Sequence, residues 1–286
     1  MKENKILISI LVPTYNRVKY LEECLDSIIE QEWFDLKELE LIVSDNSEWN
    51  ETKNFMNGYI KKHKNRNIKY NKNEKNLWMV WNWNKLLELK KWEYFIFLSD
   101  DDKFYDKDSL KTIYNWLLKY KLDVCYWKYM LIDWNGHEKG ICYWFDKIKS
   151  DNVYYDQFNE QLNFHTISFW GILYKDFWYQ YNYHMDMVAD RYMNLKYLYE
   201  KKHVWEINFF TFKYRNYDNN SIKKRNIKQV CMRRWYVYRD FHIKNPIAKS
   251  ILFASIEIFC QTKLYKMIYS KRWFIENFKK FIWRIA

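Results

Sequence analysis

Short apolar runs alternate with amphipathic segments along the first hundred residues of the chain. The apolar runs predict buried strands at 6–12, 39–43, 68–70 and 94–98. Helices, the first beginning near Val18 with apolar residues at Leu21, Leu25 and Ile28, are expected within 18–31, 51–63 and 76–91. This alternation predicts an α/β fold with a Rossmann-like, mostly parallel sheet flanked by helices.

After residue 130 the alternation becomes less regular. A strand is expected over 166–174 and a helix over 185–198. Residues 221–286 mix basic and apolar residues at helical spacing and predict a C-terminal helical extension. This change of character sets the tail, residues 221–286, apart from the rest of the chain.

The strand predicted at 94–98 leads directly into three carboxylates, Asp100, Asp101 and Asp102. In an open α/β sheet, ligands bind at the carboxyl ends of the strands. Adjacent carboxylates repel one another, and a hard cation such as Mg²⁺ or Mn²⁺ removes that repulsion while also binding substrate phosphate. The stretch predicts a metal site, and the alternative is a solvated acidic turn with Asp102 as a helix cap.

No part of the sequence is suited to crossing a membrane. Hydrophobic residues make up 49% of the chain, but no run reaches the roughly 18 to 20 apolar residues of a membrane span. The first apolar stretch stops at Pro13, so we expect no secretory signal. Five widely spaced cysteines predict reduced thiols and a cytoplasmic location.

The net charge of +12 is concentrated in the tail, residues 221–286. This segment holds 16 Lys and Arg against 3 Asp and Glu. Basic residues that alternate with Trp273, Phe274 and Phe278 are typical of a helix at a membrane interface. We expect the tail to bind an anionic membrane surface, which would make the protein peripheral on the inner face of the membrane. A packed helix with a solvated basic face is the alternative.

Five pieces of residues 6–130 resemble the family 2 glycosyltransferases with the GT-A fold. In chain order they are ILVPTYNR, YLEECLDSI, LELIVSDNS, NKNEKNLWMVWNWN and KWEYFIFLSDDD. The resemblance implies an inverting sugar transferase that uses a UDP- or dTDP-sugar donor and a divalent metal. It assigns residues 1–130 to the donor and residues 131–220 to a glycan or lipid-linked acceptor.

The same resemblance suggests which side chains bind the donor. The residues expected to bind the nucleotide sugar are Pro13, Thr14, Tyr15, Arg17, Asp45 and Asp100. Four of them are expected around the base, namely Thr14, Tyr15, Arg17 and Asp45. Asp100 is expected near the ribose. Asp101 is the expected metal ligand, and Asp102 is a second candidate because three consecutive aspartates leave the register open. Core packing for Tyr15 and a turn or cap for Asp45 are the structural alternatives.

Inversion also needs a base that accepts the proton of the acceptor hydroxyl. By resemblance this is Asp190 at the start of a helix, and Asp186, one turn earlier, is the second candidate. Ala189 stands where the family has Glu, and helix N-terminal carboxylates stabilised by the dipole are the alternative. Arg215 ends a strand-like run and could reach the diphosphate.

Two other function classes fit parts of the sequence. A nucleotidyltransferase would place a Gly-rich phosphate loop after the first strand, and residues 14–17 do not form one. A nucleic-acid-binding protein would use the basic tail but would leave the aspartates unexplained. Nucleic acid is therefore not the expected partner.

Tryptophan is unusually abundant and glycine unusually rare. The chain has 4 Gly and 16 Trp, whereas an average chain of this length has about 7% Gly, or roughly 20 residues. The family resemblance places glycine at Trp78, Trp92 and Trp170, and Trp49 and Trp134 stand in turn sequences. We hypothesise that the natural source reads the codon UGA as glycine and that these tryptophans are glycine in the native protein. Trp83, on an apolar helical face, is expected to be genuine.

Overall fold

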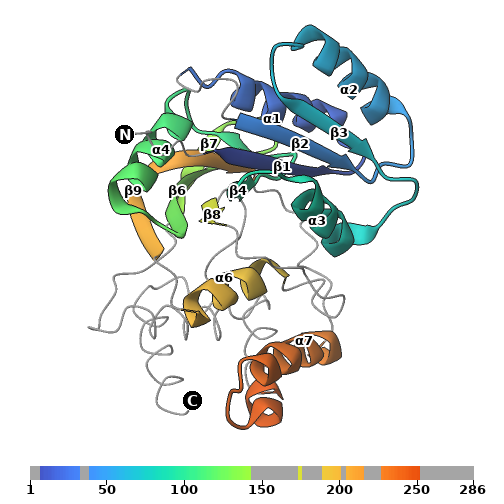
Figure 1. Ribbon diagram of the computed structural model, residues 1–286. Helices are drawn as coiled ribbons and strands as arrows, with labels where there is room; N and C mark the ends of the chain where they lie inside the picture. Colours follow the sequence, from blue (N-terminus) through green and yellow to red (C-terminus); the bar gives the residue numbers. More distant parts are fainter. Residues whose placement is uncertain are drawn as a thin grey trace. The chain divides into compact units, whose positions relative to one another are not determined.

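The computed structural model describes residues 7–32, 39–142, 173–175, 189–200, 204–215 and 227–251. The chain forms two compact units, Met1–Tyr217 and Asp218–Ala286. The first unit holds a mixed sheet and its helices (Figure 1). In the second unit the structure describes helix α7 (Ile227–Asp240).

The first unit is built from short strands and helices that alternate along the chain. Its described strands are β1 (Ile8–Thr14), β2 (Leu39–Asp45), β3 (Ile68–Lys72), β4 (Tyr94–Phe97), β5 (Lys103–Phe104), β6 (Val124–Ile132), β7 (Glu138–Cys142), β8 (Leu173–Lys175) and β9 (Val204–Arg215). Its described helices are α1 (Val18–Ile29), α2 (Glu51–Lys62), α3 (Trp78–Leu89), α4 (Ser109–Tyr120) and α6 (Ala189–Tyr199).

Within the described residues these strands form one sheet in the order β3-β2-β1-β4-β8-β6-β9-β5, and β7 pairs with β6. Strands β3, β2, β1 and β4 are parallel. The short strand β8 runs antiparallel to both β4 and β6 and joins the two halves of the sheet. On its far side β6 pairs in parallel with β9, which carries β5 as an antiparallel edge.

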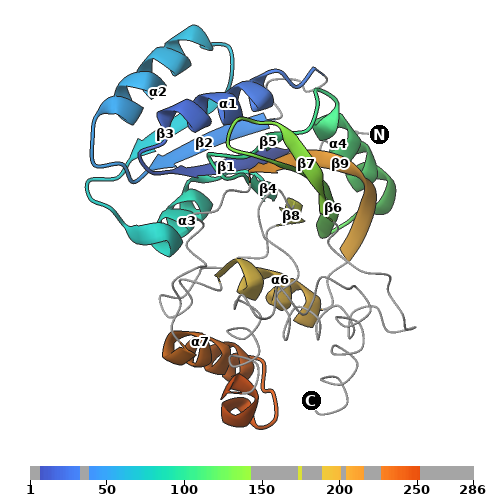
Figure 2. The same ribbon diagram turned by 180° about the vertical axis from the view of Figure 1, so that it is seen from behind.

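Helices cover both faces of the parallel half of the sheet. Helices α1 and α2 lie on one face and α3 on the other, as the two views show (Figures 1 and 2). Strand β4 is therefore buried on both sides, and Phe95, Ile96 and Phe97 are at most 2% exposed. This burial explains why the strand reads as an unbroken apolar run rather than as an alternating one.

The observed elements confirm the predicted α/β architecture, a mostly parallel sheet flanked by helices, with small shifts at the ends of the elements. The first strand was predicted to stop before Pro13, but β1 continues through Pro13, which pairs with Ser44, to Thr14. Strand β4 pairs with β1 only from Ile8 to Leu11, so Pro13 lies beyond the part of β1 that is paired on that side.

Several predicted elements fall partly or wholly outside the described residues. Only the end of the strand predicted at 166–174 is described, as part of β8, and the helix predicted at 185–198 is described from Ala189 onward as α6. Residues 252–286, which hold most of the basic tail, are not described. None of the helices in the described ranges is long and apolar enough to cross a membrane.

Candidate active site

Polar residues from three strands meet at the carboxyl edge of the parallel half of the sheet. Thr14 at the end of β1 lies in register with Asp45 at the end of β2. Beyond β4, the Leu98 backbone N–H donates to Leu11 O at 3.0 Å and carries the chain alongside β1 to the aspartates. The sheet therefore gathers side chains that are separated by as many as 86 positions in sequence.

Asp100 fastens the turn after β4 to the loop after β1. Its Oδ2 accepts a hydrogen bond from Thr14 Oγ1 at 2.8 Å and a longer one from the Tyr15 backbone N–H at 3.4 Å. Its Oδ1 accepts from Arg17 Nη1 at 3.3 Å. Asp100 thus contacts Thr14, Tyr15 and Arg17. All four residues were expected to bind the nucleotide sugar.

Asp101 is held within the same turn. Arg17 Nη1 donates to Asp101 Oδ2 at 2.8 Å, and Ser99 Oγ donates to Oδ1. The turn is closed by a hydrogen bond from the Asp102 backbone N–H to Ser99 O at 3.0 Å. Arg17 therefore bridges two of the three aspartates.

Asp102 contacts the end of β9, where its Oδ1 accepts the Arg215 backbone N–H at 2.8 Å. The Arg215 guanidinium, which stacks over the Tyr20 ring at 4.7 Å, is almost fully buried. It donates to the carbonyl oxygens of Asp101 (2.9 Å), Asp133 (3.3 Å) and Trp134 (2.8 Å) and to the Glu23 carboxylate (2.6 Å). Arg215 was a candidate to reach the diphosphate, and in this structure its guanidinium anchors the aspartate turn.

The three aspartates are buried, with exposed fractions of 4% for Asp100, 8% for Asp101 and 3% for Asp102. Burial raises the pKa of Asp100 to about 7, repulsion from Asp101 adds to this effect, and Arg17 opposes it. Burial followed by the Asp101 charge also raises the pKa of Asp102. These carboxylates are therefore costly to ionise together, and a cation beside them would favour their charged forms.

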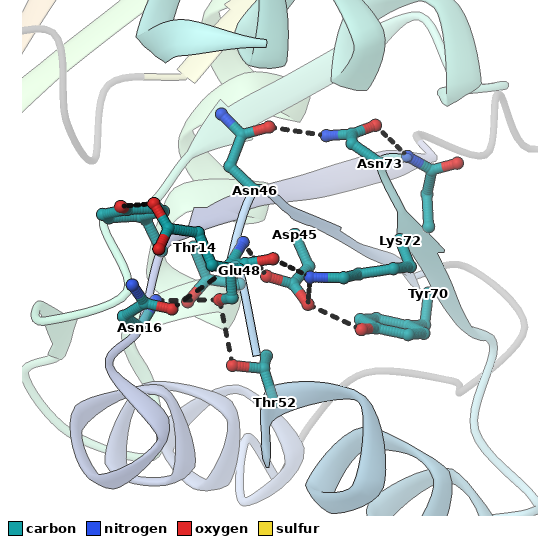
Figure 3. A network of polar contacts seen from close by, with 12 residues as sticks. Thr14, Asn16, Asp45, Asn46, Glu48, Thr52, Tyr70, Lys72 and Asn73 are labelled. Carbon is teal, nitrogen blue, oxygen red and sulfur yellow. Dashed lines mark hydrogen bonds and ion pairs between the residues drawn. The ribbon is translucent and has the colours of Figure 1, made fainter. Parts of the chain in front are cut away.

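Asp45 is completely buried and belongs to the polar network that Figure 3 shows. Its Oδ1 accepts the Ser47 backbone N–H at 2.6 Å, and its Oδ2 accepts the Tyr70 hydroxyl at 2.7 Å. Lys72 Nζ lies 3.3 Å from Oδ2 and also donates to Ser47 O. The structure thus places a cation and a hydroxyl of β3 on the carboxylate that was expected at the nucleotide base.

The loops after β1 and β2 are tied together beside Asp45. The Asn16 backbone N–H donates to Ser47 Oγ at 2.8 Å, and the Glu48 backbone N–H donates to Asn16 Oδ1 at 3.3 Å. Tyr15 is 42% exposed, and its hydroxyl donates to Glu48 Oε1 at 2.9 Å. This exposure argues against the core-packing alternative for Tyr15.

The sequence analysis did not single out Tyr70, Lys72 or the asparagines beside them, Asn46, Asn73 and Asn82. Asn73 Nδ2 donates to Asn46 Oδ1 at 2.8 Å and to Asn82 Oδ1 at 2.9 Å. The available signal was the run 70–73, where four polar side chains follow one another on β3 and its loop. A buried strand would carry apolar residues there. The partners of these polar side chains lie on β2 and α3, which the local pattern does not reveal.

The donor set at Asp100 and Asp101 fits a divalent cation of the Mg²⁺ or Mn²⁺ type. Both side chains offer carboxylate oxygen, and such cations are commonly held by one or two carboxylates together with substrate phosphate. Within the described ranges, no group of three or more His, Cys, Asp or Glu side chains is arranged to hold a metal ion. Because Asp102 faces β9, Asp101 is the better placed of the two predicted ligands.

The predicted catalytic base is described only in part. Asp190 is the second residue of α6, in agreement with its expected place at the start of a helix. Asp186 lies outside the described residues. The roles assigned to both residues stay predictions.

The model of glycosyl transferase family 2 matches residues 9–183. The chain is also 38% identical over 113 residues to the abequosyltransferase RfbV of Salmonella typhimurium, covering 39% of this chain and 33% of that protein. It is 27% identical over 240 residues to the glycosyltransferase GlyA of Streptococcus pneumoniae, covering 80% of this chain and 32% of that protein. The chain thus spans about a third of the length of these relatives.

Solved structures confirm the fold. The S. aureus protein TarS, residues 1–349 in complex with UDP-GlcNAc, superposes with a TM-score of 0.62 at 17% identity, covering 88% of this chain and 72% of that one. The mannosyltransferase PcManGT of Pyrobaculum calidifontis, in complex with GDP-Man and Mn²⁺, gives a TM-score of 0.54 at 13% identity, covering 87% of this chain and 73% of that one.

Proposed function

Since the chain belongs to glycosyl transferase family 2, we propose that it transfers a sugar from a UDP- or dTDP-sugar to a glycan or lipid-linked acceptor. We further propose that the reaction inverts the sugar's anomeric configuration and depends on Mg²⁺ or Mn²⁺. Family membership favours this glycosyltransferase function over the nucleotidyltransferase and nucleic-acid-binding alternatives.

The observation that carries the proposal is the pair Asp100 and Asp101 at the carboxyl edge of the sheet. Both carboxylates are buried beside the loop after β1, to which Thr14 and Arg17 connect them. Carboxylates in this setting are suited to binding a cation and, through it, a diphosphate. Two solved neighbours that share this fold are described with UDP-GlcNAc and with GDP-Man, and they support a nucleotide-sugar donor.

In the proposed reaction the donor's diphosphate lies against the turn after β4. A bound cation would supply positive charge to the diphosphate as it departs with the bonding electrons. Asp101 would hold that cation, and Asp100 would lie near the ribose. Thr14 and the Tyr15 backbone N–H orient the Asp100 carboxylate.

The acceptor hydroxyl attacks the sugar from the face opposite the diphosphate. Asp190 accepts the hydroxyl proton, and Asp186 is the second candidate for this role. The acceptor itself is assigned to residues 131–220.

The test is a donor-hydrolysis and transfer screen with the purified full chain. UDP-, dTDP- and GDP-sugars are each assayed with and without Mn²⁺, and we expect turnover of one uridine or thymidine donor that depends on the metal. Asp101→Ala should abolish turnover and the Mn²⁺-dependent thermal shift with UDP while leaving the protein folded.

A matched control is Asp108→Ala, which removes a carboxylate from an exposed position near the start of α4. This variant should keep full turnover. Full activity of Asp101→Ala, or turnover that does not depend on metal, would exclude the proposed mechanism.

A further inference from the structure

We propose that Arg17 is an internal counter-ion that competes with the divalent cation for Asp100 and Asp101. In this proposal, which rests on the proposed function, metal binding displaces the guanidinium from the aspartates. The released guanidinium then binds the donor's diphosphate. Arg17 would thus weaken binding of the metal alone and strengthen binding of the metal together with the nucleotide.

The contacts of Arg17 are the first support. One nitrogen, Nη1, lies 2.8 Å from Asp101 Oδ2 and 3.3 Å from Asp100 Oδ1. A guanidinium between two carboxylates supplies the positive charge that the buried pair requires. It therefore stands where the sequence predicts the divalent cation to bind.

A metal and this guanidinium cannot share the position at low energy. Asp101 uses Oδ1 to accept from Ser99 and Oδ2 to accept from Arg17. A divalent cation bound to Oδ2 would lie within a few ångströms of Nη1, and two cations at that distance in a buried site repel strongly. One of them must leave before the other binds.

The position of Arg17 allows it to move. Its side chain is 42% exposed, whereas the Asp100 and Asp101 side chains are 6% and 11% exposed. The long side chain can leave the aspartates by rotating about its own bonds, and β1 and α1 need not move. A displaced guanidinium stays at the mouth of the site, and its planar fork is suited to phosphate oxygens.

Arg215 has a different role, although it also contacts the aspartate turn. Its guanidinium is about 1% exposed and donates to Glu23 and to carbonyl oxygens, and its backbone N–H contacts Asp102. A buried group with these partners holds the aspartate turn both when Arg17 contacts the aspartates and when a metal has displaced it. Of these two arginines, the geometry points to Arg17 as the one that exchanges with the metal.

The test compares Arg17→Gln with the wild-type chain in two titrations by calorimetry. In the first, Mn²⁺ alone is added, and we expect the variant to bind it about tenfold more tightly because a competing charge-assisted contact is lost. In the second, UDP is added at saturating Mn²⁺, and we expect the variant to bind it about tenfold more weakly. Lys85→Gln, which removes a charge from an exposed pair with Glu88, should leave both affinities unchanged.

The opposite signs separate this role from a structural one, since a damaged site would weaken both affinities. Equal or weaker Mn²⁺ binding by Arg17→Gln, while the wild type binds Mn²⁺ and UDP, would overturn the role of Arg17 and leave the proposed function standing. If neither protein binds Mn²⁺ or UDP, both proposals fail.

Discussion

Trp78 has a backbone conformation that favours glycine. Its φ is +65°, in the left-handed region, and its side chain is 73% exposed at the start of α3. Trp49 and Trp134 are also largely exposed, at 68% and 63%, and the buried indole N–H of Trp92 has no partner among the described residues. These features agree with the hypothesis that several tryptophans replace native glycines.

Replacing Trp78 with glycine should therefore stabilise the protein. Relief of the left-handed strain is worth about 1 kcal/mol, and little buried area is lost. Trp83→Gly is the matched control of opposite sign, because Trp83 is 2% exposed and packs near Phe97, and its loss should cost about 3 kcal/mol or more. Urea unfolding of both variants measures the difference.

Material from the native source gives a second test of the same hypothesis. Peptide masses should correspond to glycine at Trp49, Trp78, Trp92 and Trp134. Tryptophan masses at these positions, or a loss of stability in Trp78→Gly, would refute it.

Asp190 is the residue on which the proposed chemistry at the acceptor depends. Asp190→Asn keeps the size of the side chain but cannot accept a proton, so turnover should fall by roughly 10²-fold or more. Donor affinity, measured by calorimetry, should hardly change. If Asp186→Asn loses turnover while Asp190→Asn keeps it, the base is Asp186.

At the scale of elements, the local spacing of apolar residues predicted most of the helices and strands in the first half of the chain. Leu21, Leu25 and Ile28 are spaced for one helical face, and all three are buried in α1. The unbroken apolar run before Asp100 correctly predicted a strand with both faces covered. These signals lie within one element, so a single sequence is enough to read them.

Pairings between distant elements were not predictable in the same way. Strand β5 has two residues, Lys103 and Phe104, too few for any period to be visible. Its partner β9 and the pairing of β9 with β6 join segments far apart in sequence. For the same reason the contact of Arg215 with Glu23 was not predicted, because the two residues are 192 positions apart in sequence.

Arg215 at the end of β9 should therefore contribute to stability through its buried contacts with the aspartate turn. Arg215→Lys keeps a positive charge, but a lysine has fewer N–H donors and they lie on a single nitrogen. Some of the buried carbonyl oxygens that Arg215 contacts would therefore lose their hydrogen bonds. We expect the free energy of unfolding to fall by about 1 to 3 kcal/mol, as measured by urea denaturation.

The control for this prediction lies two residues away on the same strand. Lys213 pairs with Glu138 at 3.1 Å, and the Glu138 side chain is about half exposed. Lys213→Ala should cost less than about 1 kcal/mol. An equal loss in the two variants would argue against a special role for Arg215.

At the scale of the whole molecule, the excess positive charge and the second compact unit occupy nearly the same part of the chain. The segment 221–286 carries all of the net positive charge, and it begins close to the division between the two units after Tyr217. Such a basic, aromatic segment would be attracted to anionic lipid, which is also where a lipid-linked acceptor would be found.

Removing residues 270–286 should reduce binding to vesicles that contain anionic lipid. Binding of the full chain should weaken as salt is added, because the attraction is screened. A charge control keeps the aromatic residues and replaces Lys271, Arg272, Lys279, Lys280 and Arg284 with Gln. Equal sedimentation of full-length and truncated protein with the vesicles would favour a tail packed on the protein.

The attachment of Asp102 to Arg215 has a consequence for how the protein is made. The two residues are 113 positions apart, so a ribosome adding about 5 to 20 residues per second finishes the aspartates several seconds or more before their anchor. Until β9 emerges, one edge of β6 lies open and can pair with other chains. We expect nascent chains ending near residue 200 to be cut readily by protease at the aspartate turn, and chains from which β9 has fully emerged to resist. The proposed donor site would then be among the last parts of the first unit to form.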